Sequence, residues 1–196
     1  MNQESAVGTV AAGERLRTLV EIALAVALAA ALHMVKVITL PQGGSVSLEM
    51  LPIILIGFRR GVVPGVVAGV LASPILYALE PFYVHPVQLL LDYPIAFGVL
   101  GLAGLFKGEQ FAQVVTGTLF AALLRLVSHT VSGVVFFASY AQGTSAWQLK
   151  VFGAGATVPA VWVYSIGYNA SFIIPSTIAV ILLVYPIIKG MKQAGV

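Results

Sequence analysis

The stretch "QLLLDYPIAFGVLGLAGLF", residues 88–106, is long and apolar enough to cross a bilayer, yet it contains Asp92. A hydrocarbon core of about 30 Å needs roughly 20 apolar helical residues. An ionisable side chain there costs roughly 2.5–3.5 kcal/mol on insertion scales and usually faces a cavity or the bundle interior. The stretch therefore predicts a membrane-spanning helix, and Asp92 indicates a polar site inside the bundle.

The composition of the whole chain is that of a membrane protein. Of its 196 residues, 59% are hydrophobic and only 9% are charged, whereas soluble domains carry about 25% charged residues. We expect an all-α integral membrane protein with a single transmembrane domain over residues 1–196. The net charge of +3 is explained by loop topology, so no nucleic-acid partner is expected. Without cysteine, a disulfide framework and a thiolate metal site are excluded.

Apolar runs separated by short polar or Gly/Pro-rich pieces predict a bundle of six transmembrane helices after a polar segment at residues 1–16. The second run is too short for a ~30 Å core unless it tilts or is partly covered by its neighbours. Six spans place both termini on one side of the membrane. The helices are expected at about 17–40, 46–58, 61–79, 86–106, 111–140 and 160–188.

Basic residues predict which side holds the termini, because cytoplasmic loops are enriched in Lys and Arg. Two of the ten fall on the opposite side, Lys36 and Lys150, and Arg125 falls inside the fifth helix. Both termini are therefore predicted to be cytoplasmic. The opposite loops are richer in Gly and aromatics, which places a small-molecule site near the outer face. The remaining seven basic residues lie on the side of the termini: Arg15, Arg17, Arg59, Arg60, Lys107, Lys189 and Lys192.

Four ionisable residues in the predicted spans are candidates for one site: Glu49, Asp92, Arg125 and His129. Arg125 and His129 are four residues apart and share a helix face. The sequence leaves open whether Arg125 pairs with Glu49 or with Asp92, and whether these groups only join helices. Pro94 has no backbone N–H, so the helix is expected to be loosened beside Asp92.

The sixth helix begins with aromatic and amide side chains, in "YSIGYNASF" at 164–172. Aromatic faces attract cations, a carboxylate binds an amino group, and Asn both donates and accepts. With Asp92, Tyr164 and Asn169 suit a planar, partly cationic ligand. On an ideal helix, however, these last two point about 140° apart. An interfacial aromatic belt and an interhelical hydrogen bond remain alternatives.

The first helix carries small residues at four-residue spacing, Ala23, Ala27 and Ala31, with Ala25 and Ala29 on another face. Such stripes let helices approach closely in lipid. The stripe therefore predicts either internal packing or, if it faces lipid, a docking surface for another membrane protein.

Several motifs are absent from the sequence. It has no phosphate-binding loop, no H-E-x-x-H and no G-x-S-x-G, and its histidines lack metal-ligand spacing. We expect no enzyme, no cofactor and no metal site. Active transport would need energy from a partner.

Four motifs occur in order along the chain: "SLEMLPIILIGFRRG" (47–61), "QLLLDYPIAFGVLGLAGLF" (88–106), "RLVSHTVSGVVFFASYA" (125–141) and "YSIGYNASF" (164–172). With these motifs the chain resembles the thiamine-specific S-component, the substrate-binding membrane subunit of energy-coupling factor (ECF) vitamin transporters. The resemblance covers nearly the whole chain. It implies a multi-pass protein of a prokaryotic plasma membrane that binds thiamine near the extracellular side. The implied partners are an ECF transmembrane coupling protein and two ATPase subunits.

The resemblance also implies binding and docking residues. It places Glu49 close to the site and assigns Ala23 and Ala27 to the family's docking motif. Some relatives have Glu at the position of Asp92, and Trp is frequent at that of Phe137. Another vitamin or a thiamine precursor is an alternative ligand; an autonomous carrier and a small enzyme using Asp92 and His129 are less expected. The implied substrate-binding residues are Asp92, Tyr93, His129, Phe137, Tyr164 and Asn169.

Overall fold

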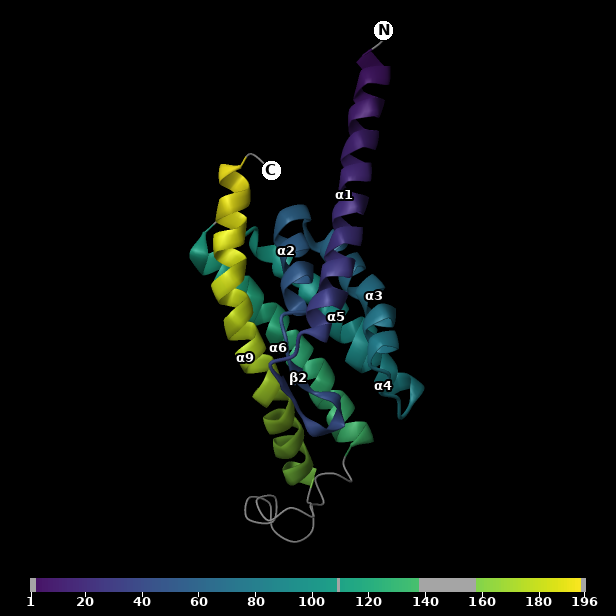
Figure 1. Ribbon diagram of the computed structural model, residues 1–196, viewed down its shortest axis with the longest axis vertical. Coiled ribbons are helices and arrows are strands. Elements are labelled where there is room, and N and C mark those ends of the chain that lie inside the picture. Colours follow the sequence, from purple (N-terminus) through teal and green to yellow (C-terminus); the bar gives the residue numbers. More distant parts are fainter. Residues whose placement is uncertain (1–2, 109, 138–157, 195–196) are drawn as a thin grey trace.

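The computed structural model describes residues 3–108, 110–137 and 158–194, and these parts are mainly helical, with one short β-hairpin (Figure 1). The hairpin joins the first two helices, and its strands pair antiparallel with Ile38 opposite Val46. The elements in chain order are α1 (Gln3–Met34), β1 (Ile38–Thr39), η1 (Pro41–Gly43), β2 (Ser45–Val46), α2 (Met50–Arg60), α3 (Val62–Leu79), α4 (Pro86–Leu90), η2 (Leu91–Ile95), α5 (Ala96–Gly98), η3 (Val99–Phe106), α6 (Phe111–Phe136) and α9 (Val158–Gln193).

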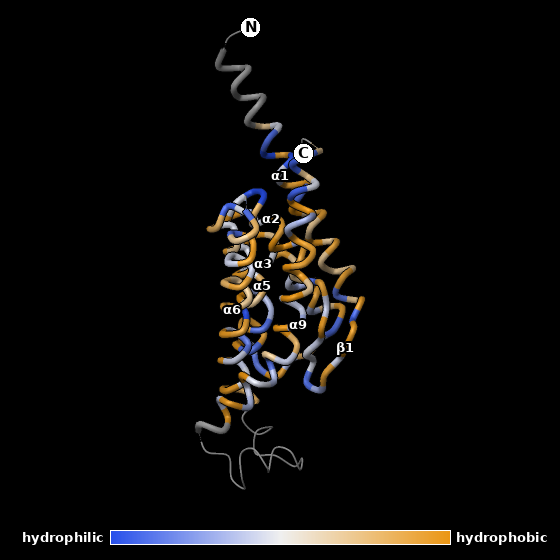
Figure 2. The backbone as a smooth tube through the Cα atoms, turned by 90° about the vertical axis from the view of Figure 1, so that its left-hand side faces the viewer, coloured by the Kyte–Doolittle hydropathy of each residue, from blue (hydrophilic) through white to orange (hydrophobic). Residues whose placement is uncertain are grey.

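Five helical segments of the described chain are long and apolar enough to cross a membrane. Hydrophobic residues run along the middle of the long helices, and hydrophilic ones gather near the end that holds both termini (Figure 2). The class of all-α membrane protein is thereby confirmed. The remaining helix, α2, has 11 residues and is buried along most of its length, so the sixth span stays a prediction. The five segments are Ala12–Met34, Val62–Leu79, Pro86–Phe106, Phe111–Phe136 and Val161–Gln193.

The first helix differs from its predicted limits at both ends. It was expected to follow a polar segment at 1–16, but α1 already includes residues 3–16. Polar residues keep a segment out of the hydrocarbon core without preventing a helix. The helix also ends at Met34 instead of residue 40, because the β-branched stretch that follows pairs as a strand. There, Val37 N–H donates to the Val46 carbonyl over 3.0 Å.

The second helix starts later than predicted for the same reason, since Val46 belongs to the hairpin. It begins at Met50 and ends at Arg60, where Gly61 adopts a φ of 91° that favours glycine. The third helix, Val62–Leu79, matches its prediction closely. The other ends differ by a few residues: α9 runs past 188 to Gln193, and α6 ends at Phe136, with the predicted residues 138–140 outside the described part.

The predicted irregularity beside Asp92 is confirmed. Leu91–Ile95 forms a π-helical turn that contains both Asp92 and Pro94. Proline cannot donate to the helix, and single π turns often occur at functional sites. The Leu91 carbonyl accepts a hydrogen bond from Ser128 Oγ of α6 at 2.6 Å. The turn therefore sets the direction of the Asp92 side chain and is tied to the neighbouring helix.

Backbone contacts through glycine hold α2, α3 and η3 together. A Cβ atom added to Gly65 would lie 2.8 Å from the Cα atoms of both Gly57 and Gly101. That is closer than real Cβ contacts allow, so only glycine fits at this crossing. Because 3₁₀ helices rarely exceed 3–4 residues, the eight-residue η3 depends on this packing.

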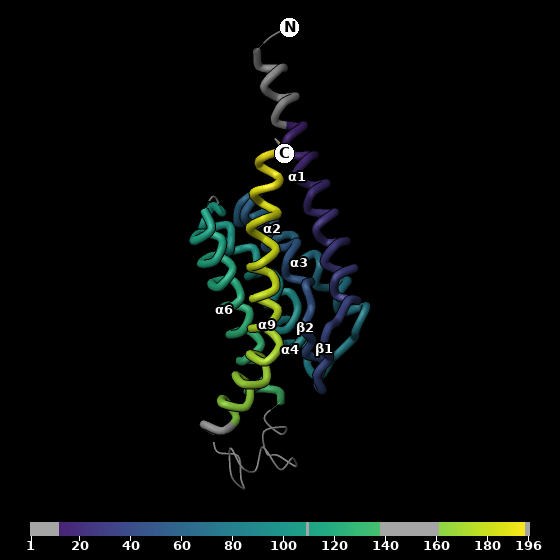
Figure 3. Tube along the Cα trace, turned by 60° about the vertical axis from the view of Figure 1, so that its left-hand side comes forward, coloured from purple at the N-terminus to yellow at the C-terminus, as the bar shows by residue number. Residues whose placement is uncertain are grey.

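The hairpin and the two termini lie toward opposite ends of the bundle. The start of α1 and the end of α9 lie at one end of the bundle (Figure 1), and β1, β2 and α4 lie toward the other (Figure 3). Any site covered by the hairpin is therefore at the end opposite to the termini.

We expect Gly65→Ala to destabilise the protein by about 1–3 kcal/mol, because the new methyl group would overpack a backbone contact. Thermal unfolding in detergent measures the effect. Gly190→Ala is the control, since a Cβ atom there meets nothing within 4 Å. Equal melting temperatures for the two variants would contradict the packing role of Gly65.

Candidate functional site

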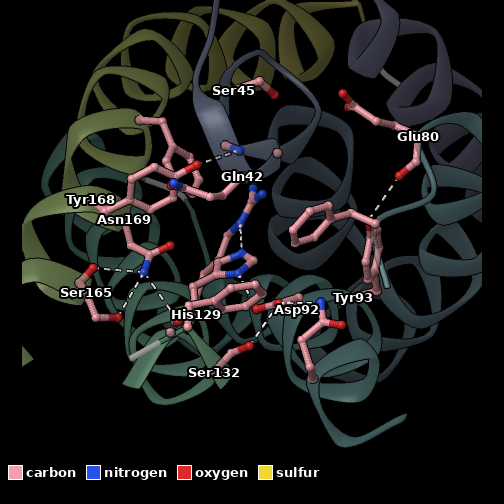
Figure 4. A pocket seen from close by; sticks show the side chains of 18 of the residues that line it. Gln42, Ser45, Glu80, Asp92, Tyr93, His129, Ser132, Ser165, Tyr168 and Asn169 are labelled. Carbon is pink, nitrogen blue, oxygen red and sulfur yellow. Dashed lines mark hydrogen bonds and ion pairs between the residues drawn. The ribbon is translucent and has the colours of Figure 1, made fainter. Parts of the chain in front are cut away.

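A cavity lies under the hairpin, between the π turn, α6 and α9 (Figure 4). It brings together all seven residues predicted for the substrate site, which come from four separate parts of the chain: the start of α2, η2, α6 with its C-cap, and α9. The residues that line it are His33, Gln42, Gly43, Gly44, Ser45, Glu49, Glu80, Phe82, Gln88, Asp92, Tyr93, Phe97, Arg125, His129, Ser132, Gly133, Phe137, Tyr164, Ser165, Tyr168, Asn169 and Phe172.

Asp92 is held by three side chains at the base of this cavity. Its Oδ1 lies 2.9 Å from His129 Nδ1. Its Oδ2 accepts hydrogen bonds from Gln88 Nε2 at 2.8 Å and from Ser132 Oγ at 2.9 Å (Figure 4). These partners replace hydrogen bonds that water would otherwise make to the carboxylate. Asp92 is therefore a fixed acceptor, ready to meet a donor or a cation in the cavity.

Glu49 is the partner of Arg125, which answers the question that the sequence left open. Arg125 NH2 lies 2.6 Å from Glu49 Oε1, and His33 Nδ1 lies 2.5 Å from Oε2. Arg125 reaches Asp92 only through His129, whose Nε2 accepts from Arg125 Nε at 3.3 Å. Glu49 lines the cavity, but it is only 3% exposed and both of its oxygens already have partners. Its position differs in this respect from that of Asp92.

The charges around the cavity favour a cation. Glu49, Glu80, Asp92 and Arg125 line it, and Lys36 forms an ion pair with Glu80. Arg125 offsets Glu49 and Lys36 offsets Glu80. Among the Lys, Arg, Asp and Glu residues of this set, one negative charge, that of Asp92, has no cationic counterpart.

Aromatic rings form the walls of the cavity. Phe137 stacks on Phe82 with 5.7 Å between ring centroids and 22° between planes. Tyr164 stacks with Tyr168 at 6.3 Å, and Tyr168 meets the edge of Phe172 at 5.9 Å. Such rings bind flat or cationic groups through their faces. The cavity thus combines aromatic walls with an acidic base.

Asn169 forms a hydrogen bond between α9 and α6, which is the interhelical alternative that the sequence predicts. Its Nδ2 donates to the Ser165 carbonyl at 2.9 Å and to the His129 carbonyl at 3.3 Å. Its oxygen points away from these bonds (Figure 4). The amide therefore has a structural bond on one side and an acceptor available to a ligand on the other.

Tyrosine hydroxyls tie the covering segments to the helices. Tyr168 donates to the Pro41 carbonyl and accepts from Gly44 N–H at 3.0 Å, which fixes the hairpin tip over the cavity. Tyr93 donates to the Glu80 carbonyl at 3.1 Å and so holds the segment after α3.

Several lining residues were not among the predicted site residues. Gln88 had a detectable signal, because it is a polar residue four positions before Asp92 in an apolar run, and it is fully buried. Ser132 continues the Arg125–His129 face, and Tyr168 shares a face with Tyr164. The pattern of residues did not single out the hairpin tip, since its place over the cavity depends on contacts distant in sequence; only the family resemblance implies a ligand under the loop between the first two helices.

Ala23 and Ala27 lie on the outside of the bundle. Both are exposed, whereas Ala25 and Ala29 are buried against neighbouring helices. Internal packing of α1 therefore uses the second alanine pair and leaves the first on the surface.

The described residues contain no group of three or more His, Asp, Glu or Cys side chains that could hold a metal ion. The arrangement suits noncovalent binding of a small molecule with donor groups and a positive charge.

The profile of the thiamine transporter protein family (Thia_YuaJ) matches residues 19–194. A Thiamine transporter ThiT from Bacillus subtilis is 39% identical over 181 residues, covering 84% of this chain and 86% of the relative. A second, from Lacticaseibacillus paracasei, is 28% identical over 192 residues, covering 87% and 86%. A solved ThiT structure from Listeria monocytogenes has the same fold, with a TM-score of 0.74 at 22% identity, covering 92% of this chain and 97% of that one.

These relatives are bacterial and are named as transporters, so the family is one of transport proteins and not of enzymes. The match extends from α1 to the last turns of α9 and includes every element that lines the cavity. This chain belongs to the thiamine transporter protein family.

Proposed function

We propose that this chain is the thiamine-binding S-component of an ECF importer in a bacterial plasma membrane. It takes up thiamine from the outer side and delivers it inward after docking on a transmembrane coupling protein with two ATPases. The observation that carries this proposal is the cavity itself, an aromatic-walled site around the fixed carboxylate of Asp92 in a member of a thiamine transporter family.

Thiamine has a thiazolium cation and a flat aminopyrimidine, and the cavity offers groups for both. The Asp92 carboxylate and the Asn169 oxygen accept hydrogen bonds from an amino group. The faces of Phe137 and Tyr164 take the cationic ring, helped by the uncompensated negative charge. His129 and Tyr93 hold the surrounding geometry through Asp92 and Glu80.

The proposed membrane topology has six spans, with α2 as the short second one, in a single domain. Both termini are cytoplasmic, since seven of the ten basic residues belong to that end by sequence. Loading from outside is then supported by the position of the hairpin, which lies toward the opposite end (Figure 3).

Replacing Asp92 by Asn should weaken thiamine binding by about 1–3 kcal/mol, because a hydrogen bond to a charged group is lost. Isothermal titration calorimetry on the purified protein measures the dissociation constant. Glu14→Gln removes an exposed carboxylate outside the cavity and should bind like the parent protein. Unchanged affinity in a folded Asp92→Asn variant would remove Asp92 from the ligand site.

Thiamine should bind more tightly than other vitamins and thiamine precursors in the same calorimetric assay. The cation and the amino group are needed together, so a precursor with only one ring should bind more weakly. Tight binding of another vitamin with no heat from thiamine would overturn the proposed ligand.

Replacing Ala27 by Trp should abolish thiamine uptake while leaving binding intact, because the large ring would prevent close approach of a partner helix. Uptake is measured in liposomes with the complete ECF module. Leu182→Trp is the control, because Leu182 is 69% exposed on α9 and away from the alanine pair. Full uptake by the Ala27 variant would place the docking face elsewhere.

A further inference from the structure

Arg125 is a buried cation that contacts His129, one of the proposed binding residues. Its charge is paired with Glu49 and not with Asp92. The residue is 5% exposed, and its Cζ atom lies 4.4 Å from the centroid of the Phe97 ring. One guanidinium nitrogen, Nε, donates to His129, and another, NH2, contacts Glu49. The position of Arg125 therefore affects which ring nitrogen of His129 carries a proton.

The hydrogen bond between Arg125 and His129 determines where the imidazole carries its proton. A guanidinium has only donors, so the Nε2 atom that receives Arg125 Nε–H at 3.3 Å must present its lone pair. The proton of a neutral imidazole then lies on the other nitrogen. That nitrogen, Nδ1, is 2.9 Å from Asp92 Oδ1 and donates to it.

The same bond leaves no place for a second proton on Nε2 of His129. A doubly protonated imidazole has a donor on each nitrogen and would direct Nε2–H at the donor of Arg125. Asp92 therefore receives a hydrogen bond from His129 but no positive charge. Its negative charge remains available to a cationic ligand.

Two further residues hold Arg125 in this position. Glu49, just before α2, contacts NH2 at 2.6 Å. Its second oxygen contacts Nδ1 of His33, in the last turn of α1, at 2.5 Å. The chain of contacts is continuous from His33 through Glu49, Arg125 and His129 to Asp92. It joins the end of α1 to the base of the cavity.

We propose that Arg125 fixes His129 as the neutral Nδ1–H tautomer, and that Glu49 and His33 hold Arg125 for this purpose. All three are positioning residues: they set the orientation and charge of the His129–Asp92 pair. The inference on the tautomer stands on the geometry alone, and its consequence for affinity rests on the proposed function.

The first test reads the tautomer directly. Nitrogen-15 NMR of the ligand-free protein with labelled histidine distinguishes the two neutral forms, and a His129→Gln sample identifies the resonance among the three histidines. The parent protein should show His129 protonated on Nδ1. Protonation on Nε2, or on both nitrogens at neutral pH, would overturn the proposal without any need for variants.

The second test removes the positioning charges as a pair. Glu49→Gln with Arg125→Met takes away both charges together, because a single change would leave the other charge buried without a partner. His129 should then lose its preference for Nδ1–H. The dissociation constant for thiamine should rise about tenfold or more, the effect of one lost charge-assisted hydrogen bond.

A matched control removes a second arginine–glutamate pair outside the cavity lining. Arg60 Nε lies 2.7 Å from Glu21 Oε2, and neither residue lines the cavity. Glu21→Gln with Arg60→Met should lower the melting temperature but leave the His129 tautomer and thiamine affinity as in the parent. This separates a loss of positioning from a general loss of stability.

The outcomes are distinct. A folded Glu49→Gln/Arg125→Met protein that retains the Nδ1–H form and its affinity would overturn the positioning role. If this variant does not fold, the measurement on the parent protein still decides the inference, because protonation of His129 on Nε2 there would overturn the role equally. Failure of the parent protein to bind thiamine would reject the proposed function, while the tautomer measurement would still decide this inference.

Discussion

The structure depends on keeping an ionised carboxylate inside an apolar helix bundle. Burying an unpaired charge is costly, so the surrounding groups must replace the water that it loses. Asp92 receives this support from Gln88 on its own segment and from His129 and Ser132 on α6. Because these donors come from two segments, the carboxylate also fixes how the segment from α4 to η3 packs on α6.

The irregular backbone around Asp92 serves the same requirement. A regular helix would present side chains at fixed angles, whereas the π turn around Pro94 changes the direction of Asp92, and the Leu91 carbonyl of this turn accepts a hydrogen bond from Ser128. The following 3₁₀ stretch then runs close to α2 and α3, with Gly65 at the crossing. Local departures from ideal geometry are thus compensated by contacts with neighbouring helices.

Glu49 is a second carboxylate of the cavity, and its partners differ from those of Asp92. In sequence, Glu49 and Asp92 are both acidic residues in apolar surroundings. In the structure, one oxygen of Glu49 contacts Arg125 and the other contacts His33. Asp92 contacts His129 and uncharged side chains, and it has no direct contact with an arginine or lysine among the described residues. This difference leaves the negative charge of the cavity at Asp92, beside the aromatic walls.

Hydropathy and the positions of polar residues along the chain predict the class of the protein and the polar residues of the site. Apolar length predicts spans such as Val62–Leu79, and the cost of charge in lipid singles out Asp92 and His129. Only contacts between distant segments show that residues 35–40 lie outside α1, with Ile38 paired to Val46, and that Arg125 pairs with Glu49. The physical reason is that periodicity and hydropathy are local, whereas strand pairing and buried ion pairs depend on which distant segments meet.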